Sequence, residues 1–449
     1  MELRDFIVTP LYFFFFMALV YWLKPYVTNE DTDRYYYPAW AVKIFGAWAL
    51  GFVYQFYYNG GDTFNFHTYG SRIIWKAFMD SPSIGLSMIF SGGEHASEFF
   101  SYSNQIYFFT DQSSFFIIRL AAIIDLFTFS TYTATALFFS FFSFIGMWFL
   151  FTTLYKRYPD LHFWLAMGCL FIPSVFFWGS GILKDSMVMG CLGFITWLLS
   201  ELFIEKRASI FKILLLIILI WAIFSVKKFI LQAYLPAAII WIYFANVKLL
   251  QSFVLRVLVL PLAIILSFVG AYYSAIKVGE NDSRYALENL ANTSRITAKD
   301  IRFQSGKGAG SGYELSAYFD GSVSNAIKLA PEAINVTLFR PYLWEVKNPL
   351  MLMSALESLT LLILTVLIIL RKGYGAFTKI LNPEVAFCFT FSLVYGFAIG
   401  VSTYNFGTLA RYKIPILPFY FCGLVILYSL VREKKLVELD ETENLSTTV

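Results

Sequence analysis

The chain has 449 residues, of which 58% are hydrophobic and only 14% are charged, whereas soluble domains carry roughly 25% charged residues. Its formal net charge of +4 is too small to indicate a nucleic-acid partner. This composition excludes an ordinary soluble domain. It predicts an all-α fold, a polytopic membrane bundle of about 11 or 12 spanning helices with further helices in the extracytoplasmic interface.

Apolar runs of about 20 residues, the length that crosses a bilayer, recur along the chain. They cover residues 7–23, 38–57, 132–155, 160–179, 186–205, 209–226, 229–246, 253–277, 349–370, 384–402 and 412–431. The first run has no small-residue cleavage site after it, so we expect a membrane helix and not a signal peptide. The four cysteines fall inside such runs and are interpreted as buried apolar side chains, not as disulfides or metal ligands.

The runs predict one transmembrane domain over residues 1–431, followed by a disordered cytoplasmic tail over 432–449. Two long segments between the runs, 58–113 and 279–333, are expected to be external loops. The second contains "GKGAGSG", which is not a phosphate-binding loop because it lacks the Lys-Ser/Thr ending and follows no predicted strand. We find no internal repeat.

Basic residues alternate between loops and thereby give an orientation. They are Lys156-Arg157, Lys206-Arg207, Lys248, Arg371-Lys372, and Arg432 with Lys434-Lys435. Placing them in the cytoplasm puts the C-terminus inside, and with run 114–129 in the interface the N-terminus lies outside. The external face then holds residues 179–185, Lys227-Lys228, 279–333 and 403–411.

The shorter run 114–129 decides where segment 58–113 lies. If this run spans the membrane, the segment is cytoplasmic. If the run lies in the interface, the segment is external with the other polar turns. Arg119 and Asp125 within the run favour the interface, because a charge at the bilayer centre costs about 2.5–3.5 kcal/mol on insertion scales.

The stretch "YNGGDTFNFHTYG", residues 58–70, interrupts the apolar pattern. Its glycines suit a turn, and Asp62 is expected to be a carboxylate at the membrane surface, facing a cavity. His67 and Tyr69 follow at spacings that one or two helical turns could place on the same side, where they would contact an acceptor. A simple loop carboxylate is the alternative.

Three further stretches place basic residues at predicted helix ends. In "WGSGILKDSMVMG", Lys184 and Asp185 begin a helix, where an anionic headgroup could bind; alternatively Asp185 faces the helix dipole and Lys184 extends to the membrane surface. In "LFRPYLWE", Arg340 either grips a phosphate or is solvated beside an aromatic anchor. In "GTLARYKIPILPF", Arg411 lies on the external side, where a cation calls for an anionic partner.

These residues suit one class of chemistry. Arginine and lysine beside an apolar environment suit a lipid-linked phosphate or pyrophosphate. A carboxylate such as Asp62 suits a general base or a ligand to a divalent metal ion, Mg or Mn. The combination predicts transfer of a group from a polyprenyl phosphate.

The stretch "YNGGDTFNFH" resembles the early external aspartate region of the GT-C superfamily of polytopic glycosyltransferases. "RYKIPILPF" is similar to the Arg-Tyr-x-x-Pro-x-x-Pro start of a late helix in many bacterial members. "FIPSVFFWGSGILKDS" and "LFRPYLWEVKNPL" look like stretches of a subgroup that builds bacterial envelope polysaccharides. The resemblance implies an inner-membrane enzyme that transfers a sugar, with inversion, from a polyprenyl-phosphate donor to a glycan, lipid or protein acceptor outside the cytoplasm. It implies that Asp62 is catalytic and that Arg411 binds the donor phosphate.

Two other functions fit the same residues. A polymerase or ligase acting on lipid-linked polysaccharide would use external arginines in the same way but would not need Asp62. A flippase or transporter of lipid-linked sugars predicts internal repeats and helices broken at mid-membrane depth.

Overall fold

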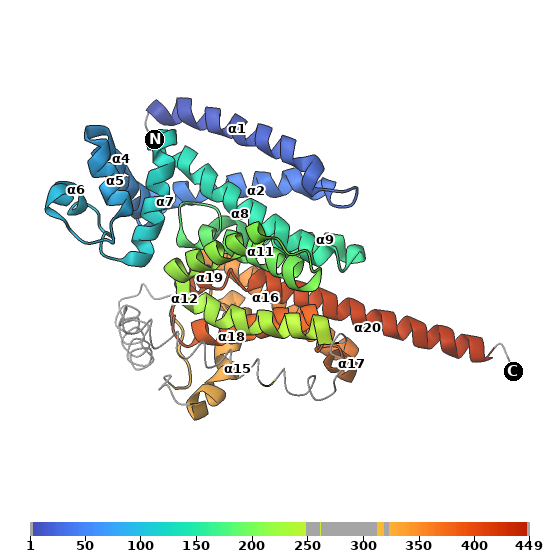
Figure 1. Ribbon diagram of the computed structural model, residues 1–449. Helices are drawn as coiled ribbons and strands as arrows, with labels where there is room; N and C mark the ends of the chain where they lie inside the picture. The colour runs from blue at the N-terminus through green and yellow to red at the C-terminus, as the bar shows by residue number, and fades with distance from the viewer. Residues whose placement is uncertain (1–2, 248–260, 262–311, 318–322, 447–449) are drawn as a thin grey trace. The chain divides into compact units, whose positions relative to one another are not determined.

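The computed structural model describes residues 3–247, 261, 312–317 and 323–446, and over these residues the protein is all-α (Figure 1). Within them, strand-like pairing is limited to one isolated bridge between Gly312 and Asn405. The predicted span 253–277 and most of the predicted loop 279–333 lie outside the described residues.

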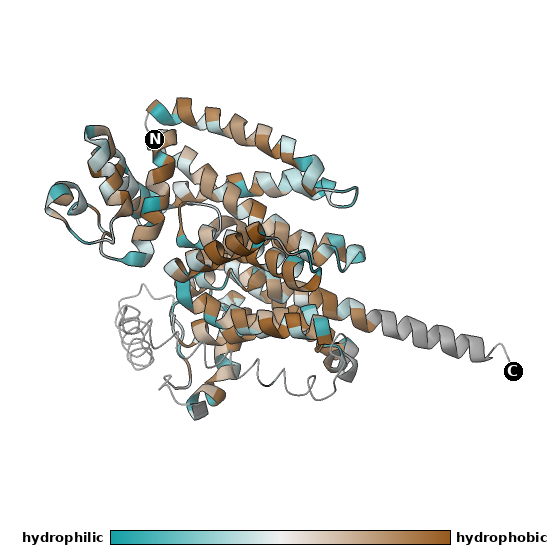
Figure 2. Ribbon diagram, in the orientation of Figure 1, coloured by the Kyte–Doolittle hydropathy of each residue, from teal (hydrophilic) through white to brown (hydrophobic). Residues whose placement is uncertain are grey.

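Six helices in the described part of the chain are long and apolar enough to cross a membrane, or seven if a bent pair near the C-terminus counts as one span. They are α1 (Leu3–Val27), α8 (Tyr132–Tyr155), α11 (Lys184–Leu199) with the π turn Ser200–Ile204 after it, α12 (Ile210–Asn246), α16 (Pro349–Lys372) and α18 (Pro383–Gly400). Apolar residues dominate long helices such as α8 and α18, and polar residues collect near helix ends (Figure 2). The chain is therefore a polytopic integral membrane protein.

Several predicted spans differ from the observed helices. The run 160–179 forms two short helices, α9 (His162–Leu170) and α10 (Pro173–Trp178), because the residue before a proline is pushed out of helical geometry. By contrast, the break predicted between the runs 209–226 and 229–246 is confirmed, because α12 consists of two helical parts separated by a kink at Lys227 (φ −146°, ψ 75°).

The described chain divides into two compact units. The first comprises Met1–Thr153, Pro173–Leu198 and Ala208–Lys228, and the second comprises Leu154–Ile172, Leu199–Arg207 and Phe229–Val449. Each is described below by itself.

Aromatic packing holds the long helices of the first unit together. Helix α2 (Asp33–Phe52) continues into the π turn Val53–Tyr57. Phe16 of α1 is buried, with its ring centroid 4.9 Å from that of Phe138 in α8 and 6.0 Å from that of Trp40 in α2. Such aromatic pairs contribute about 0.5–1.5 kcal/mol beyond the area they bury.

Segment 58–113, predicted to lie outside the membrane spans, is mostly helical. Its helices are α3 (Asp62–Phe66), the π turn His67–Ser71, α4 (Arg72–Asp80), α5 (Pro82–Phe90), the 3-10 turn Ser97–Phe99 and α6 (Phe100–Ser103). They pack around α7 (Gln112–Thr128). Helix α7 runs across the direction shared by α1, α2 and α8 (Figure 1).

The second unit is built around α18. This helix packs against α15 (Val323–Phe339) and α20 (Leu417–Ser446), while α9 and α16 also contact α20. Its smaller elements are the 3-10 turns Pro159–Leu161 and Leu343–Glu345, α17 (Tyr374–Thr378) and α19 (Phe406–Tyr412). Helix α20 continues to Ser446, where composition predicted a disordered tail, because residues 432–446 are rich in helix-forming Glu, Lys and Leu.

Candidate functional site

The stretch around Asp62 is a sharp turn between two π turns. After the π turn Val53–Tyr57, residues Asn59, Gly60 and Gly61 have φ values of 55°, 126° and 124°. A Cβ on Gly61 would lie 2.8 Å from the Tyr54 ring, so both the backbone angle and the available space require glycine there. The second π turn begins at His67. Because π turns occur frequently at functional sites, their placement on both sides of Asp62 marks this segment as a candidate site.

Asp62 is the first residue of α3 and is half-buried. It lines an open surface cavity of about 470 Å³ together with Tyr54, Tyr58 and the Asn59–Gly61 turn.

His67 and Tyr69 do not face this cavity. His67 is fully buried and its Nε2 lies 3.5 Å from Oδ1 of Asp125. Tyr69 is 55% exposed and lines a second cavity. The predicted common side for Asp62, His67 and Tyr69 assumed regular α-helical spacing, whereas the wider π turn His67–Ser71 changes the direction of each successive side chain.

Asp125 belongs to a buried polar cluster. Ser71 donates a hydrogen bond to its Oδ2 (2.7 Å) and Thr135 donates to its Oδ1 (2.6 Å). Burial would raise the pKa of this carboxyl, but His67 and the hydroxyl donors outweigh burial and hold the pKa below its usual value. The charge and the hydrogen-bond acceptors of the Asp125 carboxylate are therefore compensated by protein groups and not by lipid or water.

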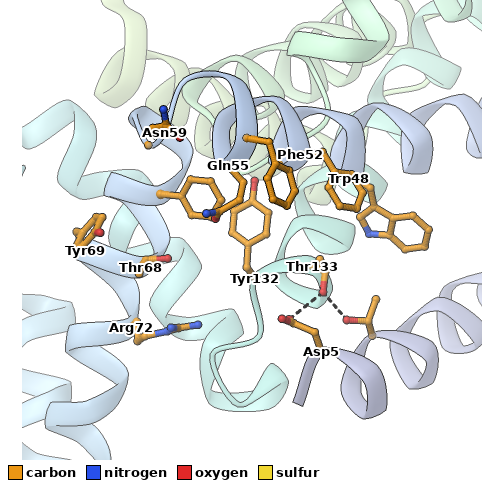
Figure 3. A pocket seen from close by; sticks show the side chains of 15 residues that line it. Asp5, Trp48, Phe52, Gln55, Asn59, Thr68, Tyr69, Arg72, Tyr132 and Thr133 are labelled. Carbon is orange, nitrogen blue, oxygen red and sulfur yellow. Dashed lines mark hydrogen bonds between the residues drawn. The ribbon is translucent and has the colours of Figure 1, made fainter. Parts of the chain in front are cut away.

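A second cavity has a volume of about 390 Å³ (Figure 3). Asn59 and Gly60 line both cavities. The apolar part of the second wall consists of Trp48, Phe52, Phe56 and Phe64, and the polar part includes Asp5, Gln55, Thr68, Arg72 and Thr133. Aromatic faces beside amide, hydroxyl and charged groups can bind a small polar ring by stacking and by hydrogen bonds.

Lys184 and Asp185 begin α11, as predicted, but each pairs with a residue from another element. Lys184 Nζ donates to Ser113 Oγ (2.7 Å) and lies 3.7 Å from Asp111 Oδ2. Lys227 Nζ lies 2.5 Å from Asp185 Oδ1. These adjacent residues thus take part in two separate ion pairs.

A buried lysine in α2 was not singled out from the sequence. Lys43 is 2% exposed. Its Nζ donates to Ser143 Oγ (2.8 Å) and to the carbonyl of Gly179 (2.9 Å), which follows the C-terminal end of α10. The sequence feature that could have identified Lys43 is that it is the one cation in the apolar run 38–57. Ionisable groups inside a membrane span are costly and often functional.

In the second unit, Arg340 is held by its own neighbours. Its guanidinium forms a bidentate ion pair with Glu345, and its Cζ lies 5.2 Å from the ring centroid of Phe406. Arg411 lies in the last turn of α19 and is half-buried. Lys413 lies at the break between α19 and α20 and is fully buried.

A buried carboxylate, Glu384 of α18, also escaped the sequence analysis. It pairs with Arg157 (2.8 Å), and Trp241 Nε1 donates to it (3.2 Å). Tyr158 also donates a hydrogen bond to it (3.1 Å). The network links α18 to α12 and to the segment between α8 and α9.

The sequence left open a metal ion, Mg or Mn, at Asp62, which is the one carboxylate among the described residues that line its cavity. In the described part of the chain, no group of three or more His, Cys, Asp or Glu residues could hold a metal ion. Mg²⁺ is commonly held by one or two carboxylates together with substrate phosphates, so Asp62 is the residue that would bind it.

Comparisons with known proteins identify no family for this chain. No protein-family model, curated protein or solved structure matches the chain.

Proposed function

We propose that the protein is an inverting glycosyltransferase that moves a sugar from a polyprenyl-phosphate donor to a glycan, lipid or protein acceptor outside the cytoplasm. The observation that carries this proposal is the half-buried Asp62 in a cavity that shares lining residues with the aromatic and polar cavity of Figure 3. A carboxylate next to a site with space and donors for a sugar ring is the arrangement a general base needs.

In this reaction Asp62 accepts the proton of an acceptor hydroxyl. The hydroxyl oxygen forms a bond to the anomeric carbon of the donor sugar on the side opposite the phosphate. The bond between that carbon and the phosphate oxygen breaks, and its electron pair leaves with the polyprenyl phosphate. The anomeric configuration is thereby inverted. The resemblance assigns the phosphate contact to Arg411.

An external site in a bacterial inner membrane is part of the same proposal. Helix α7 supports it, because this helix crosses the direction of α1, α2 and α8 (Figure 1). This orientation suits a helix in the membrane interface. Cysteine introduced at the exposed residue Glu94 should react with a membrane-impermeant maleimide in intact cells.

The decisive experiment measures sugar transfer by the full chain in lipid nanodiscs. The donor is undecaprenyl phosphate carrying a radiolabelled hexose, and a solubilised envelope-glycan extract supplies acceptors. Asp62→Asn should lower transfer about 100-fold or more, the typical contribution of a general base. The matched control is Glu94→Gln, which changes an exposed carboxylate of the same segment. Transfer that survives in Asp62→Asn would favour the polymerase or ligase function, which does not need this residue.

A flippase for lipid-linked sugars is the second candidate, because α12 is broken at Lys227 and a buried ion pair joins that point to Asp185. Broken helices and buried charges are typical of transporters. A proteoliposome assay distinguishes the two functions: a flippase moves the labelled lipid across the membrane without releasing polyprenyl phosphate, whereas a transferase releases it.

A further inference from the structure

The cavity of Figure 3 combines a flat aromatic wall with groups that bind hydroxyls. Trp48 and Phe52 come from one face of α2, and Asp5 comes from the start of α1. Its volume of about 390 Å³ lies in the usual range of small-molecule sites, about 300–1,000 Å³. The cavity is therefore large enough for one sugar ring and too small for a folded polypeptide segment.

One donor in this wall has no partner. The Trp48 Nε1 atom is buried and makes no hydrogen bond to any described residue. Buried indole N–H groups usually find an acceptor, and a buried donor left unpaired is costly. A ligand that carries a hydroxyl oxygen into the cavity would satisfy it.

The charged groups of the cavity balance each other. The lining residues include one carboxylate, Asp5, and one guanidinium, Arg72. Asp5 accepts a hydrogen bond from Thr133 (3.2 Å), and Arg72 donates to the carbonyl of Ser130 (3.1 Å). A phosphate site needs an excess of cations, so this balance favours a neutral ligand over an anionic one.

We propose that this cavity binds one pyranose ring of a neutral glycan. The ring packs its C–H face against Trp48 or Phe52, one hydroxyl accepts from Trp48 Nε1, and others bond to Asp5 and Arg72. Asn59 and Gly60 line both this cavity and that of Asp62, so a sugar held here lies against the turn that carries this carboxylate. The naming of this sugar as the acceptor rests on the proposed function, whereas the binding itself does not.

The test measures binding without any donor. The full chain in lipid nanodiscs is titrated with the methyl glycosides of glucose, galactose, mannose, rhamnose and N-acetylglucosamine, and bound ligand is followed by saturation-transfer NMR. At least one glycoside should bind saturably. Trp48→Phe keeps the ring but removes the N–H, and it should weaken that glycoside about tenfold, the effect of one buried hydrogen bond.

Two further variants provide a second test and a control. Asp5→Asn should also weaken binding, whereas Trp22→Phe, which alters an exposed tryptophan on α1, should leave it unchanged. Melting temperatures check that each variant is folded. The proposal is overturned if no glycoside binds saturably, if Trp48→Phe binds as well as the unmodified chain, or if inorganic phosphate occupies the cavity and competes.

The same titration on Asp62→Asn separates this proposal from the proposed function. Binding that persists in an inactive Asp62→Asn variant supports both. Binding together with undiminished transfer in Asp62→Asn refutes only the catalytic role of Asp62. Loss of transfer in Asp62→Asn without any glycoside binding refutes only the pyranose site.

Discussion

The Lys227 ammonium lies 2.5 Å from the Asp185 carboxylate at the point where α12 leaves helical geometry. Both side chains are buried, at 6% and 1% exposure. Buried ion pairs contribute little net stability, but breaking one leaves an uncompensated charge that costs far more. The pair therefore couples the broken point of α12 to the first turn of α11.

Removing only one member of this pair should be strongly destabilising. Lys227→Met should lower the free energy of unfolding by about 3–5 kcal/mol, because the Asp185 carboxylate loses its cation. The double variant Asp185→Asn, Lys227→Met should be more stable than Lys227→Met alone. The adjacent Lys228→Met serves as the control. Thermal unfolding in detergent measures each effect, and equal losses in the single and double variants would contradict the coupling.

The Asp125 cluster should make stability depend on acid pH. A carboxyl whose pKa is lowered on folding contributes stability that is fully present above its unfolded value of about 3.9 and is lost as pH falls through the folded value. Asp125→Asn should cost about 1–3 kcal/mol at pH 7, since buried hydroxyls lose their strongest acceptor.

Comparing the melting temperatures of the two proteins between pH 7 and pH 3 checks this prediction. The difference between the unmodified chain and Asp125→Asn should stay constant down to about pH 4 and narrow below it. Glu98→Gln, which changes an exposed carboxylate, should track the unmodified chain at every pH. A difference that widens in acid would show that Asp125 is not held ionised by this cluster.

Hydropathy predicts the membrane class and most helix locations well. The run 132–155 coincides with α8 (Tyr132–Tyr155), because a long uninterrupted apolar segment can satisfy its backbone in lipid only as a helix. The break of α12 at Lys227 was also predicted, as the gap between the runs 209–226 and 229–246. The ion pair of Lys227 with Asp185 was not, because Asp185 is distant in the sequence and no local propensity contains that contact.

Prediction of the site was limited in a similar way. The glycines and the carboxylate of the Asp62 stretch were recognisable as a surface turn from residue type alone. The direction of the His67 side chain could not be predicted from residue type, because it depends on a π turn and on Asp125 from another helix. Trp48 and Asp5 were missed because they lie in apolar or terminal segments and meet only through tertiary packing.

Alanine at the glycines of the Asp62 turn should reduce activity in a defined order. Gly61 has φ 124° and a Cβ there would meet the Tyr54 ring, while Gly60 has φ 126° with open space around it. Gly61→Ala therefore adds a clash to backbone strain of about 1–3 kcal/mol, and Gly60→Ala adds strain alone. Sugar transfer should fall most in Gly61→Ala and less in Gly60→Ala.

Gly92→Ala is the matched control for this series, because a Cβ at Gly92 meets nothing within 4 Å and its backbone needs no positive φ. It should leave transfer unchanged. Gly61→Ala with full activity would mean that the turn does not position Asp62, and it would remove the main structural support for a catalytic role.

Lys413 should stabilise the break between α19 and α20, which are bent by 65°. Its Nζ donates to Ser358 Oγ (2.7 Å) on α16 and to the carbonyl of Arg340 (3.2 Å). The side chain thus links the broken span to α16 and to the end of α15.

Lys413→Ala should lower the free energy of unfolding by about 1–3 kcal/mol, because two buried polar groups lose their donor. Ser358→Ala removes one of these contacts and should cost less, about 0.5–1.5 kcal/mol. Lys328→Ala, at an exposed position of α15, controls for the general loss of a lysine. Thermal unfolding of the three variants in the same lipid nanodiscs gives the comparison. If Lys413→Ala were no less stable than Lys328→Ala, the bend would have to be held by packing alone, since the hydrogen bonds of Lys413 would then contribute nothing measurable.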